Sequence, residues 1–322
     1  MDAWLTMISA VLAVFGIAAL GFFCRRLDWL TEKADNSLLR MVVRVLMPCL
    51  IFDVMLGNER LLTPGNVVLP PLVGFGSIVI GVVVAGAAAH LLRRVPGLQT
   101  SAQRRTFAFC VGMYNYGYVP LPLSTALFED GQGVVGVLFV HNMGVEIAMW
   151  TLGVLLLAGR LGADWWKKLI NAPLIAIVAA LAMNFLGLHA FVPDVVHQMF
   201  HMLGAAAIPL AVLLIGATIA DHLGDASFRH AGGLMSLACL LRLGILPVMF
   251  LAVAAVLPAS LELKRVIALE AAMPAAVFPI VMARHYNGDP ATAIRVVIAT
   301  SFVSLLTMPL WLQFGLTWLN AG

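Results

Sequence analysis

Charged residues are scarce in this chain of 322 residues. Asp, Glu, Lys and Arg make up 11% of the sequence, 62% of the residues are apolar, and the mean hydropathy is +0.99. A typical soluble domain has about 25% charged residues, and a domain of this size cannot bury so much apolar surface. The composition therefore predicts a protein that uses lipid as part of its solvent. The small net charge of +3 gives no reason to expect a nucleic-acid partner.

Common catalytic and metal-binding patterns are also missing. The chain has no GxxxxGKS/T phosphate loop, no HExxH and no GxSxG. No two cysteines form a CxxC pair, which argues against a zinc or redox motif; they are Cys24, Cys49, Cys110 and Cys239. We therefore expect no enzymatic activity, no cofactor and no metal. Gly74-Phe75-Gly76-Ser77 is interpreted as a run of small residues for close helix contact.

The sequence has instead a series of long apolar runs. A helix needs about 20 residues to cross the hydrocarbon core, and backbone in lipid must be paired within its own segment, which favours helices over open strands. The first run is preceded by Asp2 rather than by a basic stretch, and Arg25 and Arg26 follow it, so we interpret it as a retained helix and not as a signal peptide. The ten expected spans are 5–23, 38–56, 66–92, 104–127, 133–158, 171–188, 200–221, 233–257, 263–285 and 292–319.

Basic residues are unevenly distributed between the expected connections, and basic connections stay on the cytoplasmic side. The even-numbered connections hold only Arg60, Lys264 and Arg265. The odd-numbered connections hold Arg25, Arg26, Lys33, Arg93, Arg94, Arg104, Arg105, Arg160, Lys167, Lys168, Arg229, Arg284 and Arg295. We therefore expect both termini to face away from the cytoplasm.

Matching residues recur at a nearly constant separation along the chain. The pairs are Met47-Pro48 with Ile208-Pro209, Pro120 with Pro279, Asp130 with Asp289, and Trp150 with Trp311. Each half then holds five spans, an odd number, so the halves must have opposite orientations, a plan common among secondary transporters. The sequence thus predicts an all-α integral membrane protein of ten helices in two inverted five-helix repeats, 1–158 and 171–322, joined by a short cytoplasmic linker, 159–170.

The fourth expected span contains residues that interrupt a helix. Gly117 permits unusual backbone angles, and Pro120 and Pro122 follow it closely. Because a proline lacks an N–H and clashes with the carbonyl four residues earlier, Pro120 should free the carbonyl of Tyr116, and Pro122 that of Tyr118. We expect a broken helix here.

The ninth expected span repeats this pattern. Pro274 should free the carbonyl of Glu270, and Pro279 that of Ala275. Freed backbone at membrane depth is tolerated only inside protein or beside a wet cavity, and the N-termini of half-helices attract anions. Matching interruptions in two halves predict a transport site; the alternative is a pair of ordinary proline kinks.

Four stretches resemble the auxin efflux carrier family, which includes plant auxin exporters and bacterial malonate-type carriers. They are Pro48-Cys49-Leu50-Ile51-Phe52, Asn115 to Pro122, Arg242 to Pro247, and Phe278 to Asn287. The resemblance covers nearly the whole chain. It implies that broken helices four and nine cross at their prolines, that a small organic anion is held there, and that Asn115 contacts it. It also implies a location in the inner (plasma) membrane of a bacterium. The short linker lacks the long loop of many plant members, so auxin itself is not implied.

Polar residues inside the expected spans complete the candidate substrate site, because each is costly at mid-bilayer. The forked guanidinium of Arg242 can hold a carboxylate at two points; the alternatives are a structural pair with Glu270 and snorkelling to the interface. The candidate substrate-binding residues are Asn115, Tyr116, Gly117, Pro120, Pro122, Asn142, Arg242, Pro274 and Pro279.

Three further residues are candidates for ion coupling: Glu270, His141 and Asp53. Glu270 lies one helical turn before Pro274, and burial favours the protonated form of a carboxyl group. An internal salt bridge is the alternative for Glu270, and a structural hydrogen bond is the alternative for His141.

These features favour a secondary transporter, active or facilitated, that moves a malonate-like carboxylate or an auxin-like acid by alternating access. One alternative is a sodium-coupled carrier like the bile acid symporter family, which shares the inverted ten-helix plan; the other is a receptor or scaffold that binds a ligand without moving it. The expected partners are the anion, the lipid bilayer and, for coupling, H+ or Na+. The sequence does not specify the exact substrate, the direction of transport or the coupling ion. It also does not specify the oligomeric state, for which a homodimer is one option.

Overall fold

The computed structural model describes residues 3–128, 131–161, 165–223 and 231–320 of the chain. These residues form a bundle of helices without strands, and two segments between helices meet in an isolated β-bridge. The expectation of an all-α protein is therefore confirmed for this part of the chain. Asp130 and Arg229, used above for the repeat and for the charge distribution, lie outside it, as does part of the linker 159–170.

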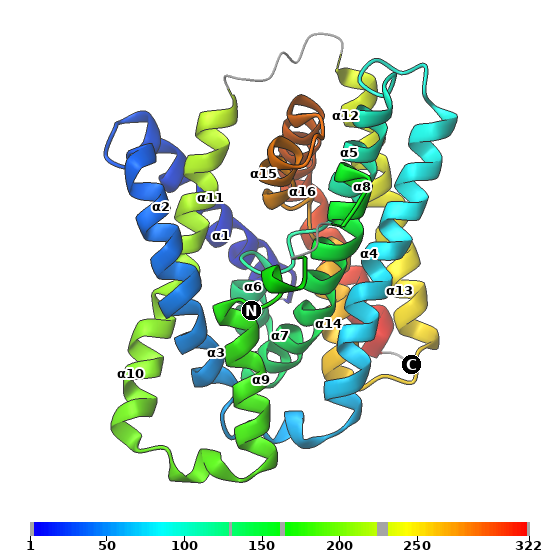
Figure 1. Ribbon diagram of the computed structural model, residues 1–322. Helices are drawn as coiled ribbons and strands as arrows, with labels where there is room; N and C mark the ends of the chain where they lie inside the picture. Colours follow the sequence, from blue (N-terminus) through cyan, green and yellow to red (C-terminus); the bar gives the residue numbers. More distant parts are fainter. Residues whose placement is uncertain (1–2, 129–130, 162–164, 224–230, 321–322) are drawn as a thin grey trace.

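Many of the helices are short and follow one another end to end (Figure 1). The α-helices are α1 (Ala3–Arg26), α2 (Glu32–Met41), α3 (Met47–Met55), α4 (Gly65–Leu91), α5 (Ser101–Gly112), α6 (Pro120–Leu127), α7 (Gly131–Ala148), α8 (Val154–Ala158), α9 (Ala172–Phe185), α10 (Asp194–Ala205), α11 (Ala207–Leu223), α12 (Gly232–Leu240), α13 (Leu246–Val256), α14 (Leu261–Ala272), α15 (Phe278–His285) and α16 (Pro290–Asn320). The π-helical turns are η1 (Val42–Leu46), η3 (Met149–Gly153) and η6 (Leu241–Ile245), and the 3-10 turns are η2 (Glu59–Leu62), η4 (Trp165–Lys168) and η5 (Leu188–Phe191).

Six helical segments among the described residues are long and apolar enough to cross a bilayer. They are Trp4–Arg26, Gly65–Leu91, Gln132–Ala158, Asp194–Leu223, Gly232–Val256 and Pro290–Leu319. The chain is therefore a multi-pass membrane protein by length and composition. The other four expected spans fall on shorter or more polar helices. The fourth and ninth are interrupted, and the second begins with the charged helix α2. The sixth corresponds to α9, which ends before Gly187, whose φ is +69°.

The helices pack in two groups that draw on both halves of the sequence. Helices α1, α2, α3, α9, α10 and α11 pack mainly on one another, and α4 to α8 pack with α12 to α16. In Figure 1 helices α2, α3 and α10 stand on the left and α4, α12 and α13 on the right. Helices α1, α6, α7 and α16 supply contacts between the two groups. Helices distant in sequence are thus joined in each group.

Glycine allows the two closest helix pairs to form. A methyl group at Gly144 of α7 would overlap the carbonyl oxygen of Pro71 in α4, and one at Gly216 of α11 would overlap the carbonyl oxygen of Ala18 in α1. Gly74 likewise faces the backbone of α7. Small residues are the usual means of close helix contact in membranes, so the interpretation of Gly74 as a contact residue is confirmed.

A proline also shapes the helix formed by α12, η6 and α13. Pro247 lies in the first turn of α13, and the carbonyl four residues earlier, that of Leu243, loses its usual donor. The indole Nε1 of Trp311 in α16 donates a hydrogen bond of 2.6 Å to this carbonyl. A side chain from another helix thus replaces the missing backbone donor, which is how proline is accommodated in lipid.

Candidate functional site

The two proline-containing segments are non-helical, and they pair with each other. Helix α5 ends at Gly112 and α6 begins at Pro120, while α14 ends at Ala272 and α15 begins at Phe278. Segments 113–119 and 273–277, here called the break pair, meet in an antiparallel bridge between Tyr114 and Ala275. Two hydrogen bonds of 2.9 Å form this bridge, from the Asn115 N–H to the Pro274 carbonyl and from the Ala276 N–H to the Met113 carbonyl. The interruption expected at each site is therefore present.

Side chains satisfy the carbonyls that Pro120 and Pro274 were expected to free. The Nδ2 of Asn142 in α7 donates to the Tyr116 carbonyl at 2.7 Å. A guanidinium nitrogen of Arg242 donates to the Glu270 carbonyl at 3.1 Å. The freed N–H of Ala275 donates to Oγ1 of Thr300 in α16 at 3.2 Å. Helices from the same packing group therefore hold both breaks open.

Arg242 belongs to η6 and is completely buried, and its guanidinium lies at the C-terminal end of α14. Its Nε donates to the Met273 carbonyl at 3.0 Å, and its Nη2 also reaches the Ala271 carbonyl at 3.3 Å. The guanidinium carbon lies 5.1 Å from the ring centroid of Tyr114 and 5.4 Å from that of Phe250. A cation at this end of a helix is stabilised by the helix dipole. Arg242 thus caps α14 and contacts the ring of Tyr114, which belongs to segment 113–119. Its Nη1 has no hydrogen-bond partner among the described residues.

A chain of hydrogen bonds leads from α4 to the first break. Ser77 Oγ lies 2.7 Å from the Tyr114 hydroxyl, which lies 3.5 Å from Nε2 of His141. Nδ1 of His141 lies 3.3 Å from Oδ1 of Asn142, the residue that holds the Tyr116 carbonyl. His141 therefore positions Asn142, and the structure brings both to the break pair as expected from the sequence.

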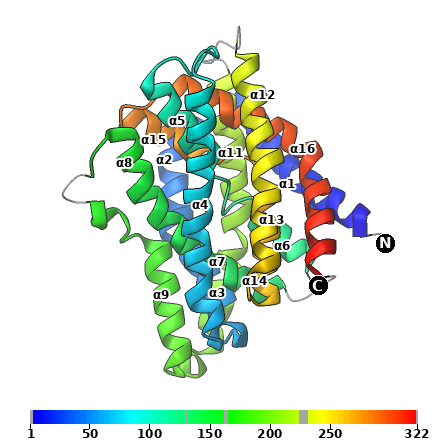
Figure 2. The ribbon, with the colours of Figure 1, turned by 90° about the vertical axis from the view of Figure 1, so that its right-hand side faces the viewer.

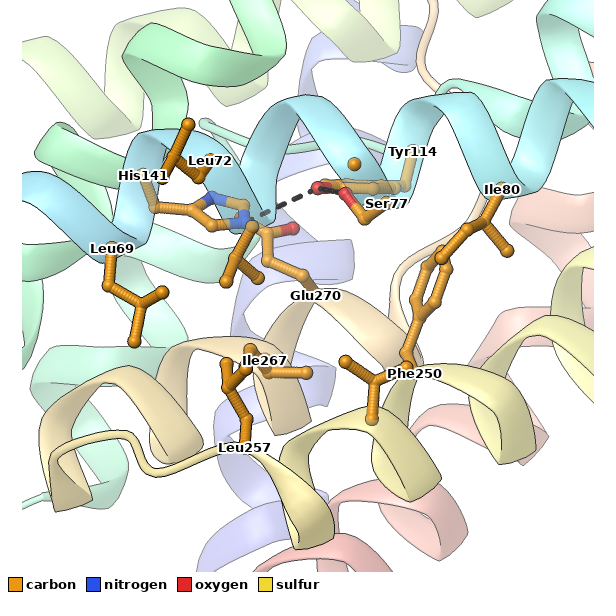
Figure 3. A pocket seen from close by; sticks show the side chains of 13 residues that line it. Leu69, Leu72, Ser77, Ile80, Tyr114, His141, Phe250, Leu257, Ile267 and Glu270 are labelled. Carbon is orange, nitrogen blue, oxygen red and sulfur yellow. Dashed lines mark hydrogen bonds between the residues drawn. The ribbon is translucent and has the colours of Figure 1, made fainter.

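Next to this chain is a cavity of about 280 Å³ between α4 and α13 (Figure 3). Its walls are mostly aliphatic, while Ser77, Tyr114, His141 and Glu270 supply polar groups. Glu270 is 2% exposed, and neither carboxylate oxygen has a hydrogen-bond partner among the described residues. The carboxylate of Glu270 is thus an unmatched buried group beside the break pair.

Open space also adjoins the first break at Asn115 and Gly117. The Asn115 side chain is 8% exposed, and no hydrogen bond to its amide is found within the described ranges. A methyl group at Gly117 would meet no atom within 4 Å. Pro120 and Pro279, both buried, lie in the first turns of α6 and α15, so that both helices begin directly after the break pair, and Pro122 follows in the first turn of α6.

One candidate residue lies elsewhere. Oδ2 of Asp53 in α3 is 3.1 Å from Nδ1 of His201 in α10, and Asp53 lines neither the cavity nor the breaks. The sequence interpretation also missed residues. Ser77 was assigned to helix contact, and Thr300 gives no local signal because it lies within the apolar helix α16.

The comparisons with known proteins agree with this architecture. The sequence profile of the membrane transport protein family matches residues 6–163 and 160–312. The chain belongs to this family. It is also 28% identical over 306 residues to an uncharacterized transporter of Methanothermobacter thermautotrophicus, covering 94% of this chain and 96% of the relative. The resemblance to auxin efflux carriers, which this family contains, is thereby confirmed.

Arg242→Met tests the capping role of the guanidinium. The substitution preserves side-chain length but leaves the carbonyls of Ala271 and Met273 without their donor and that of Glu270 with only the Met273 N–H. A buried polar group left unsatisfied costs about 1–3 kcal/mol. We expect the thermal unfolding temperature of the purified protein to fall by several degrees. Arg44→Met, at an exposed position in η1, is the matched control and should change it little. Equal unfolding temperatures for the two variants would contradict the capping role.

Proposed function

We propose that this member of the membrane transport protein family is a secondary transporter that binds a small organic anion at the break pair and moves it by alternating access. The observation that carries the proposal is the pairing of two largely buried non-helical segments, one from each half of the chain. Such irregular backbone is stable in a membrane protein where it is buried or lines a cavity, and in transporters it forms the substrate site.

The anion contacts Asn115, Tyr116 and Gly117 in this proposal. Asn115 supplies an amide donor that no other described residue uses, and Gly117 leaves space for the solute. Helices α6 and α15, whose first turns contain Pro120, Pro122 and Pro279, begin directly after the break pair. Each helix start carries about half a positive charge, which favours an anion there. Asn142, Arg242 and Pro274 serve mainly to hold the breaks open.

The arrangement of the helices supports alternating access. The proposed membrane topology is ten spans in two inverted repeats, 1–158 and 171–322, in which the interrupted helices are the fourth and the ninth. The two packing groups each contain helices from both proposed repeats. Movement of the group that carries the break pair against the group of α1, α2, α3, α9, α10 and α11 would expose the site to either side in turn.

Substitutions at the first break test the site. Asn115→Ala removes the amide, and Gly117→Leu fills the space beside it without meeting a neighbour, so both should lower uptake of radiolabelled malonate or indole-3-acetate into proteoliposomes by about tenfold or more, as expected for loss of a hydrogen bond to a charged group. Gly16→Leu, on the exposed face of α1, is the control and should transport normally. Full transport by both site variants, with wild-type folding, would remove the first break from the site. Binding without flux by the wild type would favour a receptor.

Glu270 and His141 are the proposed coupling residues, and the proton is the proposed ion. Glu270 is a buried carboxyl group beside an apolar cavity, and its oxygens have no hydrogen-bond partner among the described residues. Buried carboxyl groups inside membrane proteins commonly carry protons. Asp53, which pairs with His201 at a distance from the breaks, is not part of this proposal.

Glu270→Gln tests the coupling. The amide keeps the shape of the protonated acid but cannot release a proton, so accumulation driven by an imposed pH gradient should be lost while exchange of labelled for unlabelled substrate persists. Proton-driven accumulation that survives in the variant would exclude Glu270. A wild-type flux that depends on sodium and not on the pH gradient would indicate the sodium-coupled alternative.

In the proposed orientation the protein lies in a bacterial inner membrane with both termini on the side away from the cytoplasm. The basic residues of the odd-numbered connections support it, because such residues stay in the cytoplasm. A single cysteine appended to the C-terminus of a cysteine-free variant should react with a membrane-impermeant maleimide in spheroplasts. Reaction only after permeabilisation would mean that the C-terminus is cytoplasmic.

A further inference from the structure

The cavity between α4 and α13 lies between two apolar helices and has exposed residues in its walls. Both helices belong to apolar segments long enough to span a membrane, and they lie side by side in both ribbon views (Figures 1 and 2). Leu72 and Val253, which line the cavity, are 64% and 36% exposed. Asn115 and Gly117 do not line it. The cavity is therefore separate from the proposed anion site and is accessible from lipid.

One of the residues that line the cavity, Glu270, has a carboxyl group without a hydrogen-bond partner among the described residues. Figure 3 shows Glu270 directed toward the space bounded by His141, Tyr114 and Ile267. Its oxygens receive no hydrogen bond from the described residues. An unpartnered buried carboxylate is costly, and at membrane depth such a group is expected to serve a ligand or an ion. The group that satisfies it must bring hydrogen-bond donors, because an ionised carboxylate only accepts.

Arg242 donates no hydrogen bond to this carboxylate. Its guanidinium lies over the rings of Tyr114 and Phe250, it does not line the cavity, and two of its nitrogens donate to backbone carbonyls at the end of α14. The positive charge of Arg242 therefore acts on Glu270 only from beyond hydrogen-bond distance and is shared with the negative end of the helix dipole. The Glu270 oxygens still lack hydrogen-bond donors among the described residues.

We infer that this cavity is a binding site for a small lipophilic amine that enters from the bilayer. The ammonium group donates to the Glu270 carboxylate, with the Tyr114 and Ser77 oxygens as further acceptors in the same cavity. The hydrocarbon body occupies the aliphatic walls, as in ligand sites that combine apolar surfaces with a few polar groups. A volume of about 280 Å³ suits one ring with a short alkyl chain.

Binding of 4-phenylbutylamine to the purified protein in phosphatidylcholine nanodiscs tests the site, with 4-phenylbutanol as the uncharged compound of the same shape. We expect saturable binding of the amine, measured by ligand-observed NMR against empty nanodiscs, and at least about tenfold weaker binding of the alcohol, since a hydrogen bond to a charged group is lost. Equal binding of both compounds would show a hydrocarbon site only and would overturn the inference, as would no binding of the amine.

Two variants locate the bound amine. Glu270→Gln removes the negative charge and should weaken binding about tenfold or more. Gly76→Leu adds a bulky side chain at a position that lines the cavity and where a Cβ meets no atom within 4 Å, so it should abolish binding even if Glu270→Gln proves unstable. Gly16→Leu on α1 is the matched control and should bind as the wild type does. Unchanged binding in Gly76→Leu would overturn the inference. None of these measurements requires transport, so their outcome is independent of the proposed function.

Discussion

The pairing of buried backbone groups is the constraint on which this structure depends. An N–H or C=O without a partner in an apolar environment is costly, and prolines remove helical donors in two buried segments. The two hydrogen bonds that join Asn115 to Pro274 and Ala276 to Met113 satisfy the break pair from within. Each break is therefore stable only because the other lies against it, which places residues from both halves of the chain at one point.

The same constraint sorts the buried polar side chains. Asn142, Arg242 and Thr300 each bond a main-chain group of the break pair, and Trp311 bonds the Leu243 carbonyl that Pro247 leaves without a donor. These hydrogen bonds to the backbone explain their presence in apolar helices without a ligand. The Glu270 carboxylate has no hydrogen-bond partner among the described residues, and Asn115 bonds the other break through its main-chain N–H rather than its side chain. This contrast is the physical reason to propose that Asn115 contacts the solute and that Glu270 contacts an ion or an amine.

The prolines predicted both breaks and the carbonyls of Tyr116 and Glu270, because the effect of proline is local. The partners of those carbonyls could not be predicted, because Arg242 reaches α14 through tertiary packing. The roles expected for its guanidinium were anion binding, a pair with Glu270 and snorkelling, and the hydrogen bond that it makes to the Glu270 carbonyl was not among them. Gly76 could have been separated from Gly74 on the sequence alone, since residues two apart do not face the same side of a helix. Gly74 contacts α7, and Gly76 lines the cavity.

The commitment of Arg242 to backbone carbonyls bears on which anions fit the proposed site. Two of the three guanidinium nitrogens donate to backbone carbonyls at the end of α14, and the first turns of α6 and α15 are the positive groups that directly follow the break pair. Each supplies about half a unit charge, so together they match one carboxylate. A second carboxylate on the same solute would face no comparable group, and the Glu270 carboxylate nearby would oppose it unless protonated. The charges around the break pair therefore favour a monoanion, or a dicarboxylate that arrives with one proton.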